Sequence, residues 1–179
     1  EELGPFVVET IDDFTAINYV KALAPPDNKI QGGPPRALKP STKLMKHQEA
    51  GLNWLISSHN VGLPGVLNAD DMGLGKTLQA LAFLALYREQ IPPQRRRPCL
   101  IVAPTGLLNN WLEEITNHLG ETGLGEITAA YDRRLKDLKV GVSGRDTDSG
   151  VPLLNVNKLN SSNIVLTTYE TLRDYQISF

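Results

Sequence analysis

The sequence predicts an α/β fold in which a parallel sheet carries helices on both faces. Three short apolar runs, residues 66–69, 99–103 and 164–166, have the composition of buried strands. A polar loop and a helix-like segment follow each run, and helical crossovers of this kind join parallel strands. Because parallel strands end at one edge of a sheet, we expect the three polar loops to gather there.

The composition is that of a globular protein. Of 179 residues, 41% are apolar and 21% are charged, and the net charge of −2 confines any nucleic-acid site to a local patch. Cys99 is the only cysteine, which excludes an intrachain disulfide and fits a reducing compartment inside the cell. No apolar run is long enough for a membrane span, and the acidic start does not resemble a signal peptide. Since the first residue is not Met, we expect a fragment of a longer protein.

Residues 1–37 are expected to form an extension and a Pro/Gly linker ahead of the main lobe, residues 38–179. A cap-like start and apolar positions on one side predict a short helix over residues 10–24. A second helix is expected from Ser41, its N-cap, to about residue 58. On that helix Gln48 is an amide on an otherwise apolar face. It either bonds nearby backbone or pairs with the N6/N7 edge of adenine.

Residues 70–77 predict a phosphate-binding loop between a strand and a helix. The loop proper consists of Asp70, Asp71, Met72, Gly73, Leu74 and Gly75. Its backbone N–H groups and the helix dipole would attract an anion. Lys76 would supply a positive charge for β- and γ-phosphates, and the Thr77 hydroxyl suits Mg²⁺. Asp70 stands where the general pattern of such loops has its first glycine.

The other two strands also end in polar residues. Thr105 follows the second strand and either caps a helix or offers its hydroxyl to a phosphate. Thr168 and Tyr169 follow the third. A weaker strand is expected over residues 126–131, and a long connection without regular structure over residues 139–163.

Three consecutive arginines, residues 95–97, precede the second strand. Ligands of open α/β sheets bind at the opposite, carboxyl ends of the strands. We therefore interpret the arginines as a solvated turn rather than as a nucleic-acid site.

Four segments together resemble the Swi/Snf-type DNA translocases of helicase superfamily two. Residues 44–55 resemble the Q motif of that family, and residues 70–77 match its motif I, including the Asp in place of the first Gly. Residues 101–105 are similar to motif Ia, and residues 165–172 to motif Ib. The motifs occur in the family's order.

The resemblance implies the first part of a RecA-like lobe that binds ATP and Mg²⁺ and tracks along double-stranded DNA. By matching position, Gln48 would read adenine, the loop through Lys76 would hold phosphates, and Thr77 would ligate Mg²⁺. Thr105, Thr168 and Tyr169 would lie near the DNA. The intact protein would be a DNA-dependent ATP hydrolase of the chromatin-remodelling type, nuclear in a eukaryote and cytoplasmic or nucleoid-associated in a prokaryote.

The family's motif II, an Asp-Glu-x-His-like box, should follow motif Ib, yet no such box occurs in the sequence. The resemblance also implies a second RecA-like lobe in cis that carries an arginine finger. Phosphoryl transfer needs these parts, so we expect the segment to bind ATP without turnover. Two alternatives remain open at this point: another P-loop enzyme, such as a small-molecule kinase, and a non-catalytic interaction module.

Overall fold

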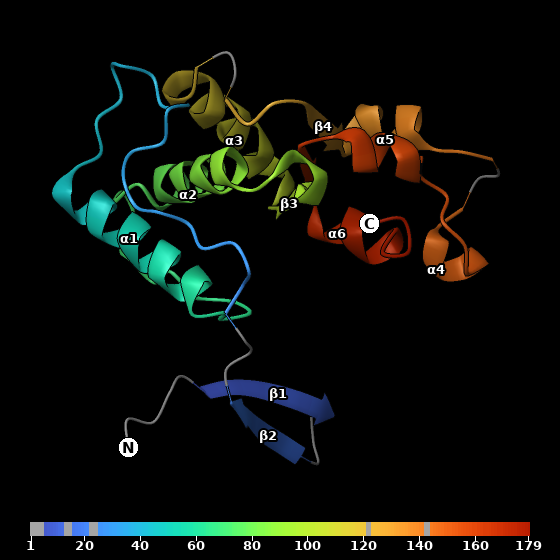
Figure 1. Ribbon diagram of the computed structural model, residues 1–179. Helices are drawn as coiled ribbons and strands as arrows, with labels where there is room; N and C mark the ends of the chain where they lie inside the picture. The colour runs from blue at the N-terminus through green and yellow to red at the C-terminus, as the bar shows by residue number, and fades with distance from the viewer. Residues whose placement is uncertain (1–5, 13–15, 22–24, 121–122, 142–143) are drawn as a thin grey trace. The chain divides into compact units, whose positions relative to one another are not determined.

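The computed structural model describes residues 6–12, 16–21, 25–120, 123–141 and 144–179 (Figure 1). Contacts along the chain divide it into two compact units. The first is formed by Glu1–Arg36 and Lys43–Ile91, and the second by Ala37–Thr42 and Pro92–Phe179.

The first unit begins with an antiparallel pair of strands, β1 (Phe6–Asp12) and β2 (Ala16–Lys21). The helix predicted over residues 10–24 is therefore wrong where the structure describes that range; residues 13–15 and 22–24 lie outside the described part. The residue types explain the difference. Val and Ile occur in both segments, together with Thr in β1 and Tyr in β2, and all four residue types favour strands over helices.

Helices α1 (Lys46–Asn60) and α2 (Lys76–Gln90) pack side by side in the same unit (Figure 1). They run in the same direction, because Gln48 contacts Leu74 before the start of α2 and the His59 ring lies 5.7 Å from that of Tyr87. The apolar contact between them is buried. Its members are Ile30, Leu52, Ile56, Ala82 and Leu86. This packing sets the distance between the start of α1 and the start of α2.

The Pro- and Gly-rich residues 25–36 have no helix or strand, but they are bonded to these helices. The backbone N–H of Ile30 donates to Oδ1 of Asn60 at 2.8 Å, and Nδ2 of Asn60 donates back to the Ile30 carbonyl at 2.8 Å. Gln31 and Gln90 exchange a similar pair of bonds. This stretch therefore packs as part of the helical core.

Helix α1 begins later than predicted, and Ser41 does not cap it. The N-cap is Met45, whose backbone N–H donates to Oε1 of Gln48 at 3.0 Å. An amide three residues into a helix can satisfy the N-cap N–H in this way. The helix starts where this bond forms.

Residues 66–69 do not form the predicted strand. Val66 and Leu67 are 43% and 84% exposed, and the described residues provide no strand that pairs with this run. A strand exists only when its N–H and C=O groups find a neighbour. A short apolar run in the sequence gives no information about that neighbour.

The second unit contains the predicted parallel sheet. Its strands are β3 (Cys99–Val102), β4 (Ile127–Ala130) and β5 (Ile164–Thr167), in the order β3-β5-β4. All pairs are parallel, and β5 lies at the centre with its four residues buried. The short turn η1 (Pro93–Arg95) precedes β3, so the arginine run lies at the amino end of that strand as predicted.

Helices flank this sheet, which confirms the α/β class. Helix α3 (Thr105–His118) follows β3 and connects toward β4. The N-cap of α3 is Pro104, and no side chain caps it, so the capping role considered for Thr105 is wrong. The remaining helical segments are η2 (Asp132–Leu138), α4 (Asp146–Ser149), α5 (Val156–Ser161) and α6 (Tyr169–Asp174).

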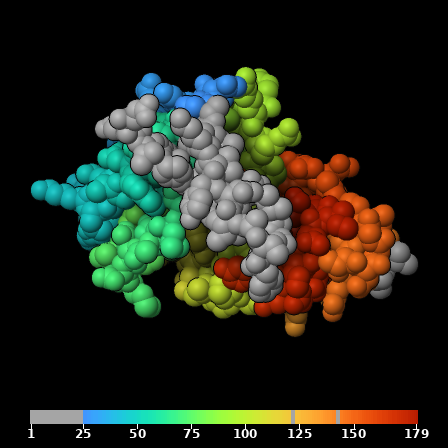
Figure 2. Space-filling model, turned by 90° about the horizontal axis from the view of Figure 1, so that it is seen from below, coloured from blue at the N-terminus to red at the C-terminus, as the bar shows by residue number. Residues whose placement is uncertain are grey.

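The connection over residues 139–163 is more structured than predicted. The buried carboxylate of Asp146 accepts the backbone N–H groups of Leu153 at 2.7 Å and Ser178 at 2.6 Å. Leu153 and Leu159 join a buried cluster with Val165 of the central strand. Figure 2 accordingly shows the orange and red atoms of the C-terminal part as one continuous mass. The polar composition of the segment did not predict these contacts, because they depend on hydrogen bonds that one aspartate accepts from distant backbone groups.

Candidate functional site

The loop before α2 adopts the backbone that its glycines allow. Gly73 and Gly75 have φ of +86° and +76°, in the left-handed region that residues with a side chain rarely enter. Gly75 is the N-cap of α2, and no side chain caps the helix there. The first amides of α2 are thus left for another acceptor, as an anion-binding helix start requires.

Lys76 lies on this loop with its amine turned toward the backbone. Its Nζ donates to the carbonyl oxygens of Asp70 at 2.5 Å and of Asp71 at 2.8 Å. The amine and the loop are therefore already in contact. Thr77 is half-buried in the first turn of α2, one residue further on.

Gln48 lies against the same loop. A side chain at Gly75 would overlap the Gln48 amide, and Nε2 of Gln48 donates to the Leu74 carbonyl at 3.4 Å. Its Oε1 accepts the Met45 N–H. The structure thus shows the backbone-bonding role considered for this residue and also places it beside the predicted phosphate loop.

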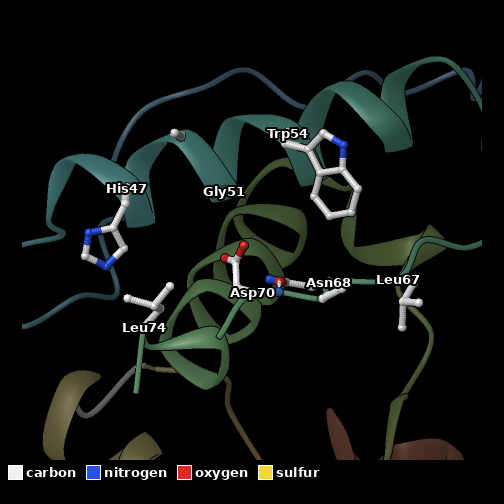
Figure 3. A pocket seen from close by; sticks show the side chains of 9 residues that line it. His47, Gly51, Trp54, Leu67, Asn68, Asp70 and Leu74 are labelled. Carbon is white, nitrogen blue, oxygen red and sulfur yellow. Dashed lines mark hydrogen bonds between the residues drawn. The ribbon is translucent and has the colours of Figure 1, made fainter. Parts of the chain in front are cut away.

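A groove of about 530 Å³ separates one face of α1 from the segment that leads into the loop. Its lining residues are His47, Ala50, Gly51, Trp54, Leu67, Asn68, Ala69, Asp70 and Leu74. In Figure 3, His47 and Trp54 project from α1 toward the segment that carries Asn68 and Asp70. The groove gives the loop an open side.

Sequence reasoning missed two side chains at this site, Gln79 and Asn68. Gln79 is fully buried, and its Oε1 accepts from Nδ2 of Asn68 at 3.2 Å. The available signal was an uncharged amide among the apolar residues of the first turns of the helix. A buried amide needs partners, and here the partners belong to the loop.

In the second unit, the predicted residues Thr105, Thr168 and Tyr169 follow strands that end side by side. Val102 of β3 is in register with Thr167 of β5, so the residues after each strand lie at one sheet edge. Thr105 is exposed, and Tyr169 is 60% exposed.

Thr168 differs from its two neighbours in the candidate set because it is buried. Its hydroxyl accepts the Thr171 N–H at 3.0 Å and donates to Oγ1 of Thr171 at 3.1 Å. This hydroxyl is the N-cap of α6. The geometry therefore gives Thr168 a structural bond at the edge, and leaves Thr105 and Tyr169 open to a ligand.

The third strand adds a basic hollow to this edge, which sequence reasoning also missed. Ala130 of β4 is in register with Thr167, and a hollow of about 570 Å³ follows it. Its lining residues are Asn109, Tyr131, Asp132, Arg133, Arg134 and Lys136. Nη1 of Arg134 donates to the Tyr131 hydroxyl at 3.2 Å, and its guanidinium lies 5.7 Å from the centre of that ring. The signal was three basic residues directly after a strand.

The described ranges contain neither a candidate metal cluster nor a candidate membrane span. No group of three or more His, Cys, Asp or Glu side chains there could hold a metal ion. No helix in that part of the chain combines the length and apolar character needed to cross a bilayer.

Together, the three-stranded parallel sheet with flanking helices and the Gly-Lys-Thr loop define the class: an incomplete RecA-like lobe of a P-loop protein. The family model of the SNF2-related domain matches residues 47–179. The chain therefore belongs to the SNF2-related family, the Swi/Snf type within helicase superfamily two. The predicted resemblance is confirmed.

Several known proteins share this segment. The Zorya protein ZorD of Escherichia coli O139:H28 is 38% identical over 151 residues, which cover 80% of this chain and 14% of that protein. The human SWI/SNF-related matrix-associated actin-dependent regulator of chromatin subfamily A containing DEAD/H box 1 is 50% identical over 82 residues, or 45% of this chain and 8% of that protein. The ISWI chromatin-remodeling complex ATPase ISW1 of Saccharomyces cerevisiae is 38% identical over 108 residues, or 59% and 9%. The chain thus spans a small part of each relative.

Proposed function

We propose that this chain is the ATP-binding segment of an ATP-dependent translocase that moves along double-stranded DNA. The observation that carries the proposal is the loop before α2. Two glycines with positive φ shape it, the helix behind it is uncapped, and Lys76 lies within it. Such a loop binds phosphates through backbone amides and one mobile positive charge.

The residues of the loop fit ATP with Mg²⁺. Lys76 would exchange the carbonyls of Asp70 and Asp71 for β- and γ-phosphate oxygens, and the amides after Gly75 would hold the same phosphates. The Thr77 hydroxyl would be a ligand of Mg²⁺. When bound, Mg²⁺ neutralises the negative charge that develops as the γ-phosphoryl group is transferred.

The Gln48 amide has enough unused donors and acceptors to pair with adenine. A side-chain amide has two hydrogens to donate and two lone pairs to accept. One hydrogen is directed at Leu74 and one lone pair at Met45. The remaining hydrogen and lone pair match N7 and the N6 amino group of adenine.

DNA would lie along the carboxyl edge of the parallel sheet. Thr105 and Tyr169 are exposed there, and the basic hollow adds Arg133, Arg134 and Lys136. Hydroxyls and basic side chains of this kind contact phosphates without reading sequence, which suits an enzyme that tracks along a backbone. The chromatin-remodeller relatives support such a substrate, which would place a eukaryotic protein in the nucleus and a prokaryotic one at the nucleoid.

Turnover would require parts that this segment does not supply by itself. Phosphoryl transfer needs an acidic residue to hold the metal, an oriented water and a cation on the transition state. We assign the first to motif II and the last to the second RecA-like lobe of the full-length protein. The segment alone is proposed to bind ATP without hydrolysing it.

Nucleotide titration of the full-length protein tests this function. Lys76→Ala removes a charged donor to phosphate, so we expect ATP affinity to fall by about 10- to 100-fold. Lys158→Ala, an exposed lysine of α5, is the matched control and should leave the affinity unchanged. Equal ATP affinity in Lys76→Ala and wild type would support the interaction-module alternative. Phosphorylation of a metabolite by the wild type would support the kinase alternative.

A further inference from the structure

Gln79 is the one fully buried amide of α2, among the residues that the structure describes there. Its side chain makes hydrogen bonds to Asn68, Asp70 and Leu74, in and just before the phosphate loop. Nε2 donates to Oδ2 of Asp70 at 3.4 Å and to the Leu74 carbonyl at 3.4 Å, and Oε1 accepts from Asn68 at 3.2 Å. An amide buried on a helix face without hydrogen-bond partners would lower the stability of the fold. These bonds offset the cost of burying the Gln79 amide.

Asn68 closes the network on the other side. Its Oδ1 accepts the backbone N–H of Asp70 at 3.1 Å, while its Nδ2 donates to Gln79. Asp70 is thus held at its backbone by Asn68 and at its carboxylate by Gln79. The first part of the phosphate loop is fixed to α2 through side chains.

Helix α1 is shaped to admit Gln79. A Cβ built on Gly51 would overlap Oε1 and Cδ of the Gln79 side chain. Glycine inside a helix costs about 0.5–1 kcal/mol relative to alanine, so this position needs a steric reason. The close approach of the Gln79 amide supplies it.

The network also explains why the loop has an aspartate in place of its first glycine. In the described part of the chain, Asp132 is the only residue other than glycine with a positive φ, so the backbone of Asp70 does not need glycine. The side chain of Asp70 instead makes the contact with Gln79. Gly73 and Gly75 carry the turn by themselves.

We propose that Gln79 is a positioning residue that keeps the phosphate loop open for nucleotide, acting through Asp70 and Leu74. When phosphate takes the Lys76 amine, the carbonyls of Asp70 and Asp71 lose that donor. The bonds from Gln79 and Asn68 still hold Asp70, so the loop keeps its shape. A loop ordered in advance binds more tightly, because less ordering entropy is lost on binding.

The proposal rests on the proposed function for its nucleotide and is tested in the full-length protein with Gln79→Leu. Leucine has a similar volume and suits a buried helix face, so thermal unfolding should stay close to that of wild type. The loop loses its donor, so we expect ATP affinity to fall about tenfold. Gln90→Leu, at the other end of α2, is the matched control and should bind ATP as wild type does.

A double-mutant cycle separates positioning from general packing. Asp70→Gly restores the general loop pattern and removes the partner of Gln79, so the combination with Gln79→Leu should weaken ATP binding by much less than the product of the single effects. Gly51→Ala should weaken binding because its Cβ displaces Gln79, and it should add little in the Gln79→Leu background. Multiplicative effects in both cycles would overturn the proposal.

Amide hydrogen exchange without nucleotide makes the outcome independent of the proposed function. Gln79→Leu should speed exchange at Asp70, while the later turns of α2 keep their protection. Unchanged exchange at Asp70, or wild-type ATP affinity in Gln79→Leu, would overturn the role of Gln79 even if Lys76→Ala abolishes binding. Faster exchange together with no ATP binding by the wild type would instead show that the proposed nucleotide is wrong.

Discussion

At the scale of single residues, the two loop glycines differ in what a side chain would meet. Both have a positive φ, but a Cβ on Gly73 would have no neighbour within 4 Å, whereas a Cβ on Gly75 would overlap the Gln48 amide. Backbone strain and steric conflict can therefore be separated by two otherwise identical substitutions.

Alanine at these two positions should have unequal effects on the nucleotide site. Gly73→Ala carries only the left-handed strain, about 1–2 kcal/mol, and we expect a moderate loss of ATP affinity. Gly75→Ala adds displacement of Gln48, so its loss of affinity should be at least tenfold greater, roughly 1.4 kcal/mol more. Isothermal titration of both variants checks this. Equal losses would mean that the contact between Gly75 and Gln48 does not matter for binding.

Single residues also mark the limit of what the sequence predicts at the site. Lys76, Thr77 and the glycines are recognisable because their spacing is set by local chain geometry. Gln79 and Asn68 are not, because their role depends on which polar groups meet in space across α1, α2 and the loop. No local pattern contains that information.

At the scale of elements, the short helix α6 depends on one hydroxyl. Thr168 is its N-cap, and the helix contains only six residues. Thr168→Ala should lower the free energy of unfolding by about 1 kcal/mol, and Thr168→Ser should retain most of it. Urea denaturation measures both. A loss as large for Ser as for Ala would assign the contribution to the methyl group rather than to the cap.

The connection before β5 depends on one carboxylate in a similar way. Asp146 accepts two backbone N–H groups, and an amide at that position would direct its own N–H₂ group at one of them. We expect Asp146→Asn to lower the free energy of unfolding by about 2 kcal/mol. Asp148→Asn, exposed on the same short helix α4, is the control and should change it by less than about 0.5 kcal/mol. Equal values in denaturant titrations would contradict this account.

Elements were predictable where an apolar run also has a neighbour to pair with. The runs that became β3 and β5 were predicted correctly because the two strands pair with each other in the sheet. The predicted burial holds for all of β5, whereas Leu100 of β3 is 42% exposed. Residues 66–69 have the same character but no paired neighbour among the described residues. In the first unit, a cap-like start predicted a helix over residues 10–24, but β-branched residues favour the strands β1 and β2 that the structure shows.

At the scale of the whole molecule, net charge says little about where nucleic acid would bind. The chain carries −2 overall, yet Arg133, Arg134 and Lys136 line one hollow at the carboxyl edge of the sheet. The arginine run at the amino end is comparable in charge but follows no strand. Position relative to the sheet, rather than charge alone, separates the two groups.

Removing two arginines from each group tests that distinction in the full-length protein. Arg133→Ala with Arg134→Ala should weaken binding of duplex DNA and reduce the slope of log affinity against log salt by about 2, while ATP affinity stays unchanged. Arg96→Ala with Arg97→Ala makes the same change in net charge and should leave the salt slope as in wild type. Fluorescence anisotropy over a salt series measures both. Identical slopes for the two double variants would mean that the basic hollow does not contact DNA.

The hydrogen bonds of Lys76 to the loop carbonyls have a kinetic consequence. On the proposed function, an arriving triphosphate would first have to displace the ammonium group from these two carbonyl oxygens, and this rearrangement would precede tight binding. Entry should therefore be slower than diffusion allows, with an observed rate that levels off as nucleotide concentration rises. Until a phosphate binds, the carbonyl oxygens of Asp70 and Asp71 would hold the Lys76 ammonium group in place.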